Sequence, residues 1–207
     1  MKKIILTVAA VFVLSFANAQ DKKEAKGFGF SEGDVFVEGS LSSTSSNDKN
    51  SDTKTSTFEF NPKAGYFLSD KFAVGVELGI GSGKTTVAGT NTSKSSNFNF
   101  GAFGRYYFLD LGQRFKTYTE FGFNVDSKKT GVSTTTTDNT FKIGAGLGLN
   151  YFATPKLAIS FGLSDVLAYK SMKSNATGDK GSNSMDLNLN VFNNFFTTPT
   201  FGMLYKF

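Results

Sequence analysis

Two interleaved phases of side chains, each with a period of two residues, run through most of the chain and constrain its fold more than any other feature. One phase is aliphatic or aromatic and carries no charge, as in Phe72, Val74, Val76 and Leu78. The other phase holds mainly glycine, asparagine and charged residues. Because successive side chains of a β-strand point to opposite faces, this alternation predicts strands with one apolar and one polar face.

Eight such strands are expected, at roughly 33–45, 56–68, 71–83, 96–109, 115–127, 139–152 and 156–169, with a last one ending at Phe207. Polar segments rich in Ser, Thr, Asn, Lys and Gly lie between them at 42–56, 82–96, 126–140 and 170–184. Short breaks near 68–71, 109–114 and 153–156 join the other strand ends. The pattern predicts an all-β, eight-stranded antiparallel up-and-down barrel with long loops at one end and tight turns at the other.

Alternation alone leaves two barrels open. A soluble barrel of the lipocalin kind turns its apolar phase inward around a ligand, whereas a transmembrane β-barrel turns it outward to lipid. Three features favour the membrane barrel: aromatic residues at strand ends, a glycine-rich opposite phase that suits a narrow lumen, and an even number of strands with short turns at one end only.

The N-terminus has the layout of a secretory signal peptide. Lys2 and Lys3 precede an apolar run over 4–16, and Ala17 and Ala19 provide a small-residue cleavage site. A membrane anchor is the alternative, but the run is shorter than the ~20 residues of a spanning helix. We expect a signal peptide at 1–19, cleavage after Ala19, a short N-terminal segment at 20–32 and an outer-membrane barrel at 33–207.

Composition excludes several functions. The chain has no Cys and no His, so it lacks the residues of Ser-His-Asp and Cys-His catalysis, of zinc fingers and of disulfides. We therefore expect no enzyme activity, no cofactor and no metal site. The net charge of +5 falls to +3 when Lys2 and Lys3 are removed with the signal peptide, which is too small a surplus to indicate nucleic-acid binding.

The C-terminal stretch 201–207 resembles the terminal strand signature of outer-membrane proteins. Its alternating residues form the expected assembly signal: Phe201, Met203, Tyr205 and Phe207. The mature chain resembles the small "porin family" outer-membrane β-barrels of the OmpX and OmpW type, and its hairpin at 65–75 is most similar to Bacteroidota members. The resemblance implies a bacterial outer-membrane location, with membrane lipid and the barrel-assembly machinery as partners. The extracellular partner stays unknown.

Two strands depart from this pattern. Asp165 falls on the apolar phase, so we expect a bulge or an exit from the membrane near Ser164. The apolar phase of the last strand extends from Met185 to Phe207, which is longer than the ~9–11 residues that span a membrane. We expect its upper half to project as a hairpin.

Charged residues of the polar phase are predicted to form a structural network in the lumen: Glu38, Glu59, Lys63, Glu77, Arg105, Glu120, Lys142 and Lys206. Charges in a narrow lumen need partners, and signs alternate between neighbouring strands. We therefore expect a structural or surface-interacting barrel whose lumen is closed by this network. The alternative is a narrow pore for ions or small solutes. Lysines of the polar segments could bridge to anionic lipid or serve ordinary solubility.

Overall fold

The computed structural model describes residues 27–188 and 200–207, all in strands, turns and irregular segments. Its strands are β1 (Val35–Asp48), β2 (Thr53–Ser69), β3 (Phe72–Val87), β4 (Thr90–Leu111), β5 (Phe115–Thr130), β6 (Thr136–Phe152), β7 (Leu157–Ser174), β8 (Ser182–Leu187) and β9 (Thr200–Lys206). The predicted signal peptide lies outside the described residues. Within the described ranges, no helix is long and apolar enough to cross a membrane.

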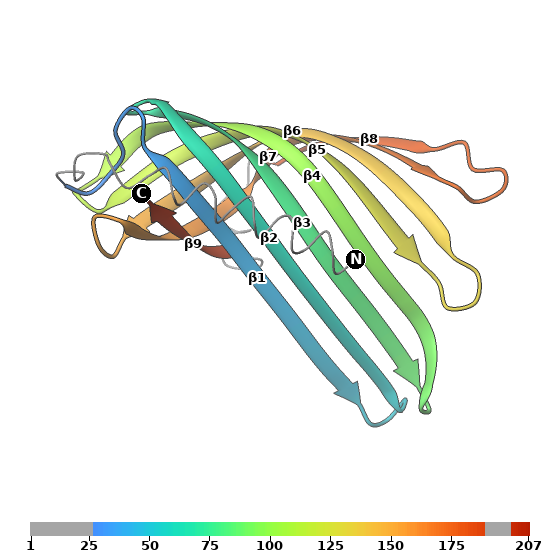
Figure 1. The fold of residues 1–207 in the computed structure, drawn as a ribbon. Coiled ribbons are helices and arrows are strands. Elements are labelled where there is room, and N and C mark those ends of the chain that lie inside the picture. Colours follow the sequence, from blue (N-terminus) through green and yellow to red (C-terminus); the bar gives the residue numbers. More distant parts are fainter. Residues whose placement is uncertain (1–26, 189–199) are drawn as a thin grey trace.

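The strands close into a barrel of eight strand positions (Figure 1). Each of β1 to β7 pairs with the next strand in antiparallel fashion, and β9 lies between β1 and β7. β8 pairs with residues 167–172 of β7, and β9 pairs with residues 157–162 on the same edge of that strand. The predicted eight-stranded up-and-down barrel is confirmed.

The apolar phase faces outward. Phe121, Ile143 and Met203 are among its most exposed residues, and Val76 is 47% exposed near the middle of β3. Charged and polar side chains such as Arg105 and Asn150 are instead buried inside. This arrangement exposes apolar side chains to lipid and excludes the lipocalin-like alternative, which would bury them around a ligand.

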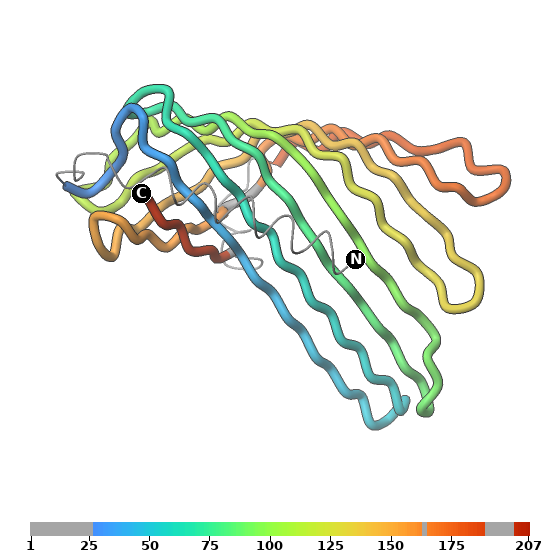
Figure 2. Tube along the Cα trace, in the orientation of Figure 1, coloured from blue at the N-terminus to red at the C-terminus, as the bar shows by residue number. Residues whose placement is uncertain are grey.

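The sequence predicted that the polar segments are long loops. In the structure they are instead the ends of long β-hairpins. β1 and β2 stay paired up to Asp48 and Thr53, and β3 and β4 up to Val87 and Thr90. The four hairpins extend beyond the closed barrel, at the end opposite the C-terminus (Figure 2). The prediction was wrong because polarity marks where a strand leaves the membrane, whereas Ser and Thr side chains still permit backbone pairing in water.

Tight turns end these hairpins. The β3–β4 hairpin turns at Ala88 and Gly89, which both adopt positive φ (47° and 78°), as a two-residue turn of the type I′ kind requires. At the β1–β2 tip the Asp48 carboxylate accepts hydrogen bonds from the Ser51 hydroxyl (2.8 Å) and the Asn50 N–H (2.9 Å). These bonds lower the pKa of Asp48.

The expected irregularity near Ser164 is confirmed. The β6–β7 register shifts twice, between Ala145 and Gly146 and between Leu147 and Gly148. The shifts place Asp165 opposite Gly146, so its carboxylate reaches Lys142 in the lumen. The expected hairpin above the last strand is also present, because β8 pairs with the upper part of β7. Residues 189–199, between β8 and β9, lie outside the described part.

Candidate functional site

Arg105 is the centre of the charged network in the lumen. It is fully buried and comes from the inward face of β4. Its Nε and Nη2 donate to Oε2 of Glu120 at 2.8 and 2.6 Å, and its Nη1 donates to Oε2 of Glu38 at 2.7 Å. One guanidinium therefore joins the neighbouring strand β5 to β1 on the other side of the lumen.

Lys63 extends the network through β2 and β3. Its Nζ lies 2.5 Å from Oε1 of Glu120 and 2.9 Å from Oε2 of Glu77. Glu38 faces Lys63, and Lys63 faces Glu77, in the strand register. Three carboxylates and two cations thus form one cluster with a formal charge of −1. A network paired in this way avoids the cost of a buried unpaired charge.

Uncharged side chains carry the network to β6 and β7. Arg105 Nη1 donates to the Tyr107 hydroxyl (3.3 Å), which donates to Oδ1 of Asn150 (2.7 Å). The Asn150 amide then donates to the Ser160 hydroxyl (2.7 Å). Tyr107, Asn150 and Ser160 are buried. The sequence did not predict a role for these residues, although all of them lie on the inward phase.

Three residues predicted for the network stand apart from it. Lys142 pairs with Asp165 at 2.5 Å. Lys206 is almost fully buried, donates to the Gly29 carbonyl (2.5 Å) and lies 3.7 Å from the Asp34 carboxylate. Glu59 is exposed, and within the described ranges it has no ion-pair partner. The structure therefore gathers five of the eight predicted residues: Glu38, Lys63, Glu77, Arg105 and Glu120.

An aromatic layer lies beside the network, toward the turn end. Its six residues come from inward positions on five strands and are buried: Phe36, Phe67, Phe103, Tyr107, Tyr118 and Phe152. The Arg105 guanidinium lies over the Tyr118 ring, 4.1 Å from its centroid. Several of these rings directly follow an outward aromatic residue, as Phe67 follows Tyr66. Such pairs of consecutive aromatics are the sequence signal for this layer.

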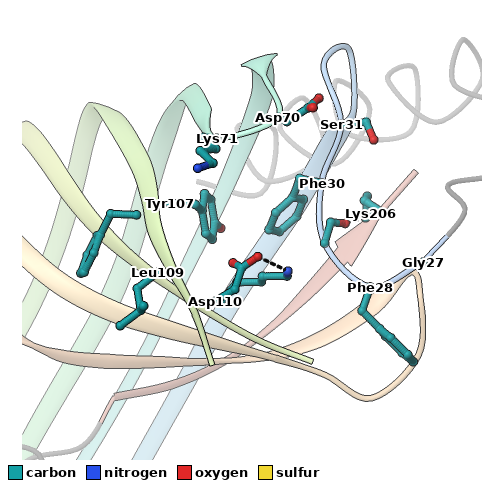
Figure 3. Close-up of a pocket in the computed structure, with 13 residues that line it drawn as sticks. Gly27, Phe28, Phe30, Ser31, Asp70, Lys71, Tyr107, Leu109, Asp110 and Lys206 are labelled. Carbon is teal, nitrogen blue, oxygen red and sulfur yellow. Dashed lines mark hydrogen bonds and ion pairs between the residues drawn. The ribbon is translucent and has the colours of Figure 1, made fainter. Parts of the chain in front are cut away.

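The N-terminal segment completes the aromatic layer, a contact that the sequence did not predict. Phe30 stacks on Phe67 with ring centroids 4.2 Å apart, and its ring also contacts Tyr107 and Phe152, at 4.8 and 5.1 Å. Figure 3 shows Phe30 and Tyr107 facing one another inside the turn end. Phe28 lies further out, 4.4 Å from the Arg114 guanidinium. Residues 27–34 therefore fold into the mouth of the barrel.

Two cavities lie on either side of these layers. The larger one, of about 1060 Å³, lies in the lumen on the side of the hairpins and is lined by Glu38, Lys63, Glu77 and Glu120. The smaller one, of about 390 Å³, opens at the turn end and is lined by Phe30, Tyr107 and Lys206 (Figure 3). The fully buried Arg105, Phe36, Phe67 and Phe152 fill the space between them.

Inward glycines make room for this filling. A Cβ at Gly148 would collide with the Tyr118 ring, and one at Gly75 would meet Phe103 Cζ at 2.5 Å. The small residues of the polar phase therefore let large side chains of other strands cross a narrow lumen. The lumen is packed at these levels because glycine alternates with the long side chains.

The network offers hydrogen bonding and charge pairing. Among the described residues, no group of three or more acidic side chains could hold a metal ion. Glu120 is held by two cations, and Arg105 by two carboxylates. Such mutual pairing is the chemistry of a structural network rather than of a group poised to transfer a proton.

These features define a class of protein: a closed antiparallel barrel with an apolar outer wall and a polar, glycine-rich interior is a transmembrane β-barrel. Residues 6–195 match the model of the outer membrane protein beta-barrel domain. The chain belongs to this family, which places it in the bacterial outer membrane. Members of the family are generally not enzymes.

Solved structures with a similar fold are small outer-membrane barrels. OprG of Pseudomonas aeruginosa is 16% identical, with a TM-score of 0.50, over 88% of this chain and 99% of that one. The Escherichia coli outer membrane protein W is 14% identical, with a TM-score of 0.43, over 86% and 99%. Neisserial surface protein A is also 14% identical, with a TM-score of 0.42, over 84% and 96%. No curated protein shows significant sequence similarity.

Proposed function

We propose that the protein is a non-conducting, non-catalytic outer-membrane barrel that holds four β-hairpins at the cell surface as an interaction platform. The observation that carries the proposal is the Arg105 network, together with the aromatic layer that lies beside it toward the turn end and includes Phe30. Both lie between the two cavities. A guanidinium that contacts Glu38 and Glu120 on opposite sides of the lumen leaves little room for hydrated ions.

The charge pattern also supports a structural role. A selectivity filter is usually built from a ring of one sign, whereas this cluster contains three acids and two bases in mutual contact. The upper cavity of about 1060 Å³ supports the alternative of a narrow pore. That alternative requires the network or the aromatic layer to open.

The hairpins give the platform its surface. Their strands continue past the last outward apolar residues, and their exposed side chains are mainly Ser, Thr, Asn and Lys. The outward side chains of β9 (Phe201, Met203 and Tyr205), with the terminal Phe207, are proposed to be read by the barrel-assembly machinery. Cleavage after Ala19 would release the mature chain.

Ion flux into liposomes tests the proposal. Liposomes that contain refolded wild-type protein should equilibrate ions no faster than liposomes without protein. The refolded state is checked independently by its resistance to unfolding in detergent. A steady flux that scales with the amount of folded protein would favour the pore.

A further inference from the structure

The outer faces of five strands carry one repeated sequence of side chains where they leave the apolar wall. Counting outward positions only, an apolar residue is followed by a serine and then by a lysine. The five triplets are Phe58-Ser56-Lys54 on β2, Ile80-Ser82-Lys84 on β3, Phe98-Ser96-Lys94 on β4, Val125-Ser127-Lys129 on β5 and Tyr169-Ser171-Lys173 on β7.

The strand register places four of these lysines, Lys54, Lys84, Lys94 and Lys129, next to one another. Lys84 and Lys94 are directly paired. The triplet serines take the other positions beside them: Ser56 pairs with Lys84, and Ser96 pairs with Lys129. Each lysine is thus opposite the next or one diagonal step away, which is about 5–8 Å in a sheet. We call these four residues the lysine row.

No acid of the described chain balances this row. The acids near it face the other side of the sheet or lie in turns, as Asp126 and Asp52 do. The lysines of the row are exposed, and within the described ranges they form no ion pair. Two like charges directly opposite on paired strands are destabilising, so Lys84 and Lys94 are more stable with an anion from outside the chain.

The position of the row identifies that anion. Each lysine is four residues beyond the last outward apolar side chain of its strand, about 13 Å along the strand and, with a tilt of about 40°, about 10 Å above it. The headgroup layer of a bilayer is about 5–8 Å thick on each side. A lysine side chain is flexible enough to reach back into it. Headgroup phosphates therefore lie within reach of the row.

We infer that the lysine row binds the phosphate groups of anionic lipid in the outer leaflet, with the triplet serines as additional hydrogen-bond donors. The contact sets the height of the hairpins above the membrane surface. It also neutralises the repulsion between Lys84 and Lys94. The inference does not depend on whether the lumen conducts.

Equilibrium unfolding in urea tests the inference in two kinds of vesicle, pure phosphatidylcholine and phosphatidylcholine mixed with phosphatidylglycerol. The row variant Lys84→Gln/Lys94→Gln/Lys129→Gln is compared with a control that has the same loss of charge, Lys49→Gln/Lys128→Gln/Lys180→Gln. Lys49 and Lys180 lie in the connections between strands, and Lys128 lies on the opposite face of β5 from Lys129.

The sign of the effect should reverse between the two lipids. In phosphatidylcholine the row variant should be as stable as wild type or more stable, because a repulsive pair is gone. In the anionic vesicles it should lose the stabilisation that wild type and control gain, on the order of tenfold to a hundredfold in the folding equilibrium constant. Added salt should shrink this gain.

Two outcomes would overturn the inference. If wild type and row variant gain equally from phosphatidylglycerol, the row does not bind lipid, and an acidic protein surface becomes the better candidate. If inorganic phosphate at matched ionic strength stabilises wild type in phosphatidylcholine as much as phosphatidylglycerol does, the site takes free phosphate rather than headgroups.

Discussion

Arg105 and Glu38 form an ion pair across the lumen: Nη1 of Arg105 lies 2.7 Å from Oε2 of Glu38, although β4 and β1 are separated by two strands. The pair ties opposite walls of the barrel to each other. Neutralising Arg105 leaves Glu38 without its cation, whereas neutralising Glu38 leaves Arg105 paired with Glu120 alone. Leaving a buried charge without its counterpart costs about 3–5 kcal/mol in proteins.

A double-mutant cycle measures this coupling. Arg105→Gln should lower the free energy of unfolding from lipid vesicles by several kcal/mol, and Glu38→Gln should lower it by less, because Arg105 keeps its pair with Glu120. The double variant should lose clearly less than the sum, because neither charge is then left alone. Strictly additive losses would show that the two residues do not act together.

The lipid-facing phase gives a second prediction. Val76 is 47% exposed on the outer face of β3, so Val76→Arg should cost about 2–4 kcal/mol if it lies near the bilayer midplane, and Ser82→Arg, further along the same face, only about 0–1 kcal/mol. Unfolding in urea from phosphatidylcholine vesicles measures both. Equal effects of the two substitutions would contradict the orientation of β3.

The inward glycines give a third prediction. A Cβ at Gly75 would collide with the Ala64 carbonyl oxygen and with the Phe103 ring, so Gly75→Ala should destabilise the barrel by about 1–3 kcal/mol through overpacking. On the next strand, a Cβ at Gly104 would meet Phe72 only at 3.4 Å, and Gly104→Ala serves as the control. A neutral Gly75→Ala would mean that the lumen is less tightly filled.

The signal peptide gives a fourth prediction. Protein recovered from the outer-membrane fraction should begin at Gln20, since Ala17 and Ala19 stand where signal peptidase requires small residues. Intact mass decides it. A mass that includes residues 1–19 would refute the secretory route.

Much of the barrel could be predicted from the sequence because a period of two residues fixes both strand and face. The same alternation placed Arg105 and Glu120 on the inward face of neighbouring strands, where they are directly paired. The Arg105–Glu38 contact could not be predicted, because it depends on the diameter of the barrel and on the reach of a long side chain. The local sequence pattern determines neither the diameter of the barrel nor the conformation of that side chain.

Other features were missed for different physical reasons. Phe30 precedes the first strand and has no periodic partner, so nothing local indicates that it enters the barrel. The irregularity near Ser164 was predicted from Asp165, but the ion pair of Asp165 with Lys142 was not, because it depends on where the two register shifts fall. The strands were predicted to end too early on the hairpin side, because Ser and Thr in the hairpins were interpreted as loop residues.

Single-channel recording in planar bilayers tests the central claim, a lumen closed by the Arg105 network and the Phe30 layer. Refolded wild type should show no steady conductance. The variant Phe30→Ala/Arg105→Ala, which removes a side chain from each layer, should leak ions, whereas Phe28→Ala, at the rim beside Arg114, should remain closed. Large and stable openings of the wild type, or a folded double variant that stays silent, would contradict the closed lumen.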